Sequence, residues 1–458
     1  MISLFRRSGL MFFLLFIAAM GTPAQEAPVG TDQAQLDNEI SFYLKKTADA
    51  PSDALHFAYL AEAYIRKARM TGEADWYDRA HKAATTSHRL NPFDPSARTA
   101  LATIAHARHK FDEARHLLDD VLADHPSDAG ALGASIIVHL AQGSVTAAGH
   151  DAELLLAALP QSPGALTYSA LVLESQGRDA EADYQYREAL RRLESDLAPA
   201  SEAWTRSLYG RFLFRKGRTA EAREMYSKAL RTLPGYHLGL FWLARLEIAE
   251  GNYREAADYL TQAFSLFPAP IYLFEKSRAM RSAGDQNGAD QTRDQAARMM
   301  RSQLDADSTS HRVDLARVLL DKGAPEDIRM ALLLLRDETT VRRDHETLFA
   351  LATALYRNDE RTEARRVLQE IFRTGIRIAD YYHLAGLIER GESDPDRARS
   401  YFELALATNP EFEPAARDPN DARKPRWSKT VRLAVTVATI MSLLIFVMYL
   451  RSRRAREL

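Results

Sequence analysis

The chain has 458 residues, of which 46% are hydrophobic and 27% are charged, a composition typical of a folded globular protein rather than a disordered one. Its formal net charge of −2 excludes the strong positive field that nucleic-acid-binding proteins use. The chain contains no cysteine, so disulfide bonds are excluded and packing must supply its stability.

The N-terminal residues 1–24 have the three parts of a secretory signal peptide. A basic lead with Arg6 and Arg7 precedes an apolar run over residues 10–20, and we expect cleavage after Ala24. The run is shorter than the roughly 20 residues of a membrane span. An uncleaved anchor is the alternative. Arg6 and Arg7 also suggest a twin-arginine signal, which we discount because a repeat array needs no cofactor loaded before export. Residues 25–34 are polar and are expected to form a flexible lead.

One helical-hairpin pattern repeats about ten times over residues 35–412. Prolines recur 34 residues apart, as at Pro92, Pro126 and Pro160. Five copies share a glycine followed five residues later by an alanine: Gly143/Ala148, Gly177/Ala182, Gly217/Ala222, Gly251/Ala256 and Gly284/Ala289. The glycine predicts a turn between two helices, the alanine predicts their close approach, and the proline ends the second helix.

These positions resemble the tetratricopeptide repeat, which has a period of about 34 residues. Its pattern is matched in the first, fifth and last copies by Leu60, Ala61, Tyr64, Ala80, Ala84, Ser87 and Pro92; by Ala222, Tyr226, Ala229 and Pro234; and by Leu384, Ala385, Ile388, Ala398, Phe402, Ala405 and Pro410. The resemblance implies an all-α fold, a right-handed superhelical α-solenoid of about ten hairpins with a concave binding face. The copies depart from the pattern around Met70–Tyr77, near Ser195–Ser201 and at Pro325.

The C-terminal part of the chain predicts a membrane anchor. Residues 413–430 form a charged spacer that contains prolines, residues 431–450 form a transmembrane helix, and the basic residues 451–458 form a cytoplasmic tail. Because the export signal carries the array across first, we expect a single-pass membrane protein with its repeats on the exported, periplasmic side. A sorting signal that is removed after export is the alternative.

No catalytic motif and no cofactor site are predicted. The chain lacks a phosphate-binding loop, a His-Glu-x-x-His motif and a Gly-x-Ser-x-Gly motif, so we expect no enzyme and no catalytic residues. Eight of the thirteen histidines lie between residues 81 and 150: His81, His88, His106, His109, His116, His125, His139 and His150. His106, His109 and His116 with Asp112 offer a divalent metal site or a pH-sensitive surface. We favour polar surface residues and predict no metal.

Four arginines stand in the same register, six residues before a glycine: Arg211, Arg245, Arg278 and Arg317 precede Gly217, Gly251, Gly284 and Gly323. Trp204, Phe241 and Phe274 lie earlier on three of the same helices. By the resemblance, this helix of each repeat lines the groove. Guanidinium groups bind carboxylates and aromatic rings anchor partners, so we predict a groove for an acidic or C-terminal peptide segment. Alternatively, the arginines pair with glutamates of neighbouring helices and the rings belong to the core.

The predicted function is that of a non-catalytic scaffold or assembly factor tethered to the membrane. Its partner is expected to be a protein or peptide, acidic or extended, and not a nucleic acid. Two alternatives stay open: a receptor for an anionic polysaccharide in envelope export, and a metal-binding accessory subunit.

Overall fold

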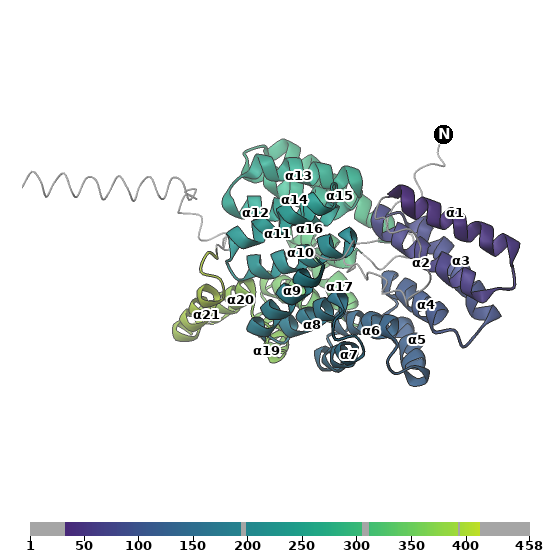
Figure 1. Ribbon diagram of the computed structural model, residues 1–458. Helices are drawn as coiled ribbons and strands as arrows, with labels where there is room; N and C mark the ends of the chain where they lie inside the picture. Colours follow the sequence, from purple (N-terminus) through teal and green to yellow (C-terminus); the bar gives the residue numbers. More distant parts are fainter. Residues whose placement is uncertain (1–32, 194–197, 305–310, 393, 413–458) are drawn as a thin grey trace, which may run out of the picture.

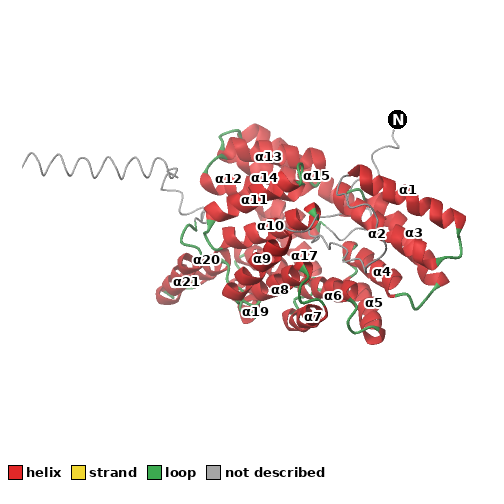
Figure 2. Ribbon diagram, viewed as in Figure 1, coloured by secondary structure: helices red, strands yellow, loops and turns green. Residues whose placement is uncertain are grey.

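The computed structural model describes residues 33–193, 198–304, 311–392 and 394–412, which form twenty-one α-helices and no strand (Figures 1 and 2). The predicted all-α class is therefore confirmed for this part of the chain. Within these ranges no helix is both long and apolar enough to cross a membrane. The predicted signal peptide, spacer, transmembrane helix and tail lie outside the described residues, as does most of the predicted lead.

Ten helical hairpins follow the single helix α1 (Gln33–Asp49), as the repeat pattern predicts. The first helices of repeats 1 to 10 are α2 (Ala54–Thr71), α4 (Pro95–Ala107), α6 (Ala129–Ala141), α8 (Pro163–Ser175), α10 (Pro199–Arg215), α12 (His237–Glu250), α14 (Pro270–Ser282), α16 (Arg312–Lys322), α18 (His345–Arg357) and α20 (Ala379–Gly391). The second helices are α3 (Ala74–Leu90), α5 (Phe111–Asp124), α7 (Val145–Ala158), α9 (Asp179–Leu193), α11 (Thr219–Thr232), α13 (Tyr253–Leu266), α15 (Gln286–Leu304), α17 (Pro325–Glu338), α19 (Arg361–Arg373) and α21 (Pro395–Thr408).

The glycine and alanine of the repeated pair do what their spacing predicts. All five glycines have a positive φ, from 70° at Gly177 to 97° at Gly284, and all five alanines are fully buried between the helices of their hairpin. In two further repeats His109 and Asp359 take the place of the glycine and adopt φ values of 58° and 61°. Pro325, which departs from the pattern, begins α17, where a proline loses no helical hydrogen bond.

The first helix of each repeat lies inside the array and the second lies outside. In α8 every residue from Ala165 to Ser175 is buried. In α9 only a stripe of residues spaced three or four apart is buried, such as Ala182, Tyr186 and Ala189. Successive first helices also contact one another, as α4 does α6 and α6 does α8. The inner helix α8 is thus enclosed over most of its surface, whereas the outer helix α9 keeps a solvated face.

The array curls until its later repeats lie against its earlier ones (Figure 1). In each contact, the turn between the two helices of an early repeat packs against the segment that follows the second helix of a later repeat. The later repeat is always five repeats further along the chain. The contacting pairs are Gly72 with Phe267, Gly143 with Arg343, Gly177 with Gly375, and Gly217 with Asn409. We call this contact the covered edge.

Hydrogen bonds hold the covered edge together. The backbone N–H of Arg343 donates to the carbonyl of Ala141 at 2.9 Å, and the guanidinium of Arg377 donates to the carbonyl of Gly177 at 2.7 Å. The ammonium of Lys216 donates to the carbonyl of Arg377 at 2.9 Å. Early and late repeats are therefore joined by backbone groups and not by surface side chains alone.

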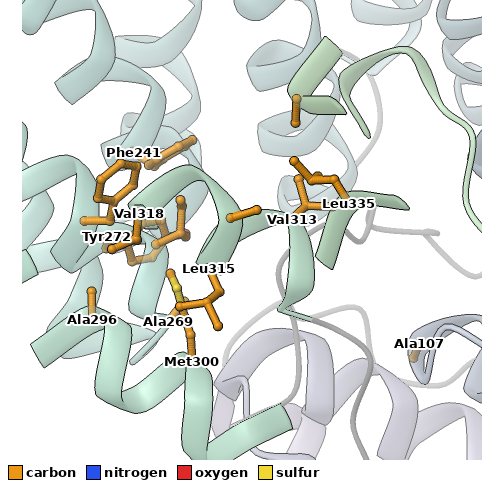
Figure 3. Packing of buried hydrophobic residues seen from close by; sticks show 14 of the residues in the cluster. Ala107, Phe241, Ala269, Tyr272, Ala296, Met300, Val313, Leu315, Val318 and Leu335 are labelled. Carbon is orange, nitrogen blue, oxygen red and sulfur yellow. The ribbon is translucent and has the colours of Figure 1, made fainter. Parts of the chain in front are cut away.

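The hydrophobic core also joins early repeats to late ones. Its largest cluster joins residues of α2–α4, such as Ala107, with residues of repeats 6 to 10, whereas repeats 3 to 5 share a second cluster. Figure 3 shows Phe241 of α12 beside Tyr272 of α14, with their ring centres 5.2 Å apart, and Val318 of α16 close by. Closure thus buries apolar surface between repeats that are distant in the sequence.

Candidate functional site: the arginine-lined interior

The four predicted arginines lie at one register on the inner helices. Arg211 is on α10, Arg245 on α12, Arg278 on α14 and Arg317 on α16. The structure brings them to the interior of the array but gives them different surroundings. The first arginine differs from the other three.

Arg211 is neutralised by the chain itself. Its guanidinium lies 3.1 Å from Glu174 of α8, and the neighbouring Arg215 lies 2.9 Å from the same carboxylate. Arg215 also reaches Glu346 of repeat 9 at 2.6 Å. We call this group of Arg211, Arg215, Glu174 and Glu346 the latch, because it joins repeats 4 and 5 to repeat 9.

Both latch carboxylates are held ionised. Burial by itself would raise the pKa of Glu174, but Arg211 and Arg215 outweigh burial and lower that pKa to about 2. Burial acts in the same direction on Glu346, and Arg215, His345 and Arg317 likewise lower its pKa to about 2. The latch is therefore a buried network of opposite charges whose members depend on one another.

Arg278 and Arg317 are paired more loosely. Arg278 lies 3.1 Å from Glu275, and Arg317 lies 3.4 Å from Asp314; each acid stands three residues earlier on the same helix. Both arginine side chains remain 32% exposed, so their outer N–H groups are open to a ligand. Arg317 also lies 3.8 Å from Glu346, at the margin of an ion pair.

Arg245 has no ion pair with any residue of the described ranges. Its guanidinium lies over the ring of Trp242, at 5.3 Å, and at 6.0 Å from the ring of Phe241. A guanidinium stacked on a ring keeps its charge and its N–H donors for another acceptor. Arg245, Arg278 and Arg317 together form what we call the open arginine row.

The predicted aromatic residues belong to the core. Trp204, Phe241 and Phe274 are between 2% and 7% exposed. Trp204 packs edge-on against Tyr168, with 5.6 Å between ring centres. The half-buried Trp242, three residues before Arg245, was missed by sequence reasoning, although that spacing places the two on one helix face.

The histidine cluster considered as an alternative does not assemble, and the favoured interpretation as surface residues is wrong for His106 and His109. His106 and His109 are buried at the end of α4, whereas His116 is exposed on α5. Among the described residues no three histidine, aspartate or glutamate side chains come together in an arrangement that holds a metal ion. Burial lowers the pKa of His106 to about 3, so this imidazole is neutral at neutral pH.

Comparison with known proteins agrees with the repeat pattern. Two tetratricopeptide repeat family models match the chain, one over residues 99–165 and the other over residues 213–272. The chain therefore contains tetratricopeptide repeats.

One curated relative is the Cellulose synthase 2 operon protein C of Komagataeibacter xylinus. It is 27% identical over 358 residues, which are 77% of this chain and 24% of that protein. The tetratricopeptide-repeat chain thus spans about a quarter of the length of this relative.

Solved structures with a similar course of the chain include a human IFIT1 dimer with PPP-AAAA. Its TM-score is 0.47 at 14% identity, covering 81% of this chain and 86% of that one. Yeast Tom70 has a TM-score of 0.36 at 14% identity, covering 90% and 93% of the two chains.

Proposed function

We propose that this tetratricopeptide-repeat protein is a non-catalytic scaffold that holds an acidic, extended segment of a partner protein against the open arginine row. A tetratricopeptide array serves protein interaction or assembly through its exposed surfaces. The binding proposal rests on a difference among the four arginines that occupy the same position on successive inner helices. Arg211 has its carboxylate partners in the chain, whereas Arg245 has none among the described residues and Arg278 and Arg317 keep a third of their side chains exposed.

The spacing of the open arginine row favours an extended ligand. Arg245, Arg278 and Arg317 come from three successive inner helices, so they succeed one another along the curved interior. A carboxylate of the ligand meets each guanidinium in turn, and it gains charge-assisted hydrogen bonds that one isolated cation does not provide. Trp242 beside Arg245 supplies an apolar contact for the same segment.

We also propose that residues 431–450 tether this scaffold to a membrane and that the array works on the exported side. The uncharged stretch from Leu433 to Leu450 and the four arginines that follow it support this part of the proposal. Protease treatment of intact cells, with and without opening of the outer envelope, tests it. Degradation of the array while the C-terminal tail stays protected is expected; protection of the array would overturn the proposed orientation.

The test of the binding proposal is affinity capture of the full-length protein from crosslinked membranes. The variant is Arg245→Gln, Arg278→Gln and Arg317→Gln together, which keeps a polar side chain with N–H donors and removes the charge. The matched control exchanges three exposed arginines of outer helices that pair only within their own helix: Arg191→Gln, Arg366→Gln and Arg399→Gln. Loss of captured proteins in the first variant alone is expected. An identical protein set in both would overturn the groove.

A second candidate function is binding of a polysaccharide, favoured by the likeness to the Cellulose synthase 2 operon protein C. Retardation of the protein in a gel that contains carboxymethylcellulose, an anionic glucan, tests this alternative. Retardation that disappears in the triple glutamine variant, together with unchanged protein capture, would favour a polysaccharide in the groove over a peptide.

A further inference from the structure

A cavity of about 260 Å³ lies where the early and late repeats meet. One wall comes from the ends of α4, α6 and α8, and the other comes from the segment before α18 and the end of α19. Protein interiors leave few voids larger than a water molecule, and one water needs only about 10–15 Å³ of such space. This cavity is therefore large enough for a small organic molecule.

Much of the cavity wall is apolar. Ile137, Leu171, Leu348 and Ile371 line it with buried side chains, and the ring of Phe111 completes the apolar surface. An apolar lining with few polar groups is the usual composition of a small-molecule site. The wall itself favours a ligand that presents C–H surface.

The charges around the cavity balance one another. Three lining arginines each pair with a lining carboxylate: Arg211 with Glu174, Arg342 with Asp344, and Arg343 with Glu370. Glu346 pairs with Arg215 behind the wall. Arg373 lies at the exposed rim, where water screens its charge. A charged ligand would have to break an existing pair to find its own partner, so the lining favours a neutral one.

His106 supplies unused hydrogen-bonding capacity to the cavity. Its side chain is only 6% exposed, and it makes no hydrogen bond with any described residue. Because burial keeps the imidazole neutral, it carries one donor and one acceptor. Both ring nitrogens of His106 are therefore available to a ligand in the cavity, one as a donor and the other as an acceptor.

We propose that this cavity binds a neutral organic molecule with hydroxyl groups and an apolar face, the chemistry of a sugar ring. Hydroxyl groups pair with the donor and acceptor of His106, and the C–H face packs against Leu171 and Phe111. The hydroxyl oxygens of Ser175 and Thr374, which donate to backbone carbonyls, keep lone pairs for the ligand. This goes beyond the scaffold function, because Arg245, Arg278 and Arg317 do not line the cavity.

The experiment titrates the full-length protein in detergent with cellobiose, a neutral disaccharide. Butyrate and butylamine serve as charged probes of small size. Saturation-transfer NMR detects contact and calorimetry gives the affinity. We expect cellobiose to bind at millimolar concentrations and both ions to bind more weakly. His106→Phe keeps the ring and removes the hydrogen bonds, and it should weaken cellobiose binding by about threefold to tenfold. Leu171→Phe narrows the cavity and should weaken it further.

His116→Phe is the matched control, because it makes the same exchange at an exposed histidine of the same repeat. Its cellobiose affinity should equal that of the unchanged protein. No binding of cellobiose, equal binding by His106→Phe, or tighter binding of butyrate would each overturn the proposal. Protein capture through the open arginine row is measured on the same variants. Unchanged capture with lost cellobiose binding separates the two sites, and thermal melting shows that each variant is folded.

Discussion

The turn glycines of repeats 4 and 6 share one sequence pattern but have different surroundings. Gly177 and Gly251 both have a positive φ and both precede a fully buried alanine by five residues. A Cβ added to Gly177 would lie 1.9 Å from the carbonyl oxygen of Gly375 on the covered edge. A Cβ added to Gly251 would meet no described atom within 4 Å.

The difference teaches that one residue type satisfies two separate demands. At every such turn the backbone needs a left-handed conformation, which glycine adopts without a steric penalty. On the covered edge the absence of a side chain also lets a second stretch of backbone approach. Gly143 and Gly217 share this second demand, because a Cβ there would meet Arg343 and Asn409 at 2.7 and 2.5 Å. On the covered edge, glycine is therefore required both by the turn and by the contact between early and late repeats. At the open turns it is required by the turn alone.

The largest expected effect comes from breaking the latch beneath the covered edge. Arg215→Leu removes the cation shared by Glu174 and Glu346, and leaves two buried carboxylates with less compensation. Removing one partner of a buried pair costs about 3–5 kcal/mol. We expect small-angle X-ray scattering to show an increased radius of gyration, while circular dichroism shows the same helix content, because each hairpin still stacks on its neighbours.

The control for this change is Arg336→Leu, at an arginine that is 44% exposed and pairs with Glu360 and Glu363. Exposed pairs contribute at most about 1 kcal/mol, so the radius of gyration should not change. An unchanged radius in Arg215→Leu as well would show that the latch does not hold the two parts together.

Gly177→Ala should have the next largest effect. The methyl group cannot fit unless the backbone at Gly375 moves, and the positive φ adds strain. Overpacking costs about 1–3 kcal/mol and a left-handed alanine about 1–2 kcal/mol, so we expect a loss of about 2–5 kcal/mol in the free energy of unfolding. Hydrogen exchange should rise first at the amides of the covered edge, including Arg343. A loss confined to the α8–α9 hairpin would contradict the contact with repeat 9.

Acid should open the covered edge gradually. The pKa of Glu174 and that of Glu346 are both lowered from 4.5 to about 2 in the folded protein. Their contribution to stability is therefore complete above about 4.5 and is lost as the pH falls toward about 2. The radius of gyration should increase over this window. Asp380 acts in the opposite direction, because burial raises its pKa. A radius that does not depend on pH would show that the latch charges do not control closure.

Much of the hairpin architecture could be predicted from the sequence because its signals are local. The glycine, alanine and proline of each repeat act within one turn or one helix pair, so their spacing alone gives ten hairpins. The common register of Arg211, Arg245, Arg278 and Arg317 could be predicted for the same reason. Glu275 and Asp314 could also have been found, since each stands three residues before an arginine.

Closure and the latch could not be predicted in this way. Glu346 meets Arg215 across 131 positions of sequence, and no repeat spacing announces that contact. This contact arises from a small rotation between neighbouring repeats, accumulated over the four steps from repeat 5 to repeat 9. Such a rotation depends on packing at every interface between repeats. For the same reason, sequence spacing alone could not distinguish the neutralised Arg211 from Arg245, which has no ion pair among the described residues.

Gly251→Ala should have the smallest effect and sharpens the comparison most. This substitution keeps the backbone strain of Gly177→Ala and omits its clash, since nothing described lies within 4 Å of the added methyl group. Strain of about 1–2 kcal/mol is partly offset because alanine restricts the unfolded chain, so we expect a net loss of about 1 kcal/mol. Thermal melting compares the two variants, and scattering should show an unchanged radius for Gly251→Ala. If both variants lost the same stability, the strain of the turn would explain the whole effect, and the approach of Gly375 to Gly177 would contribute nothing.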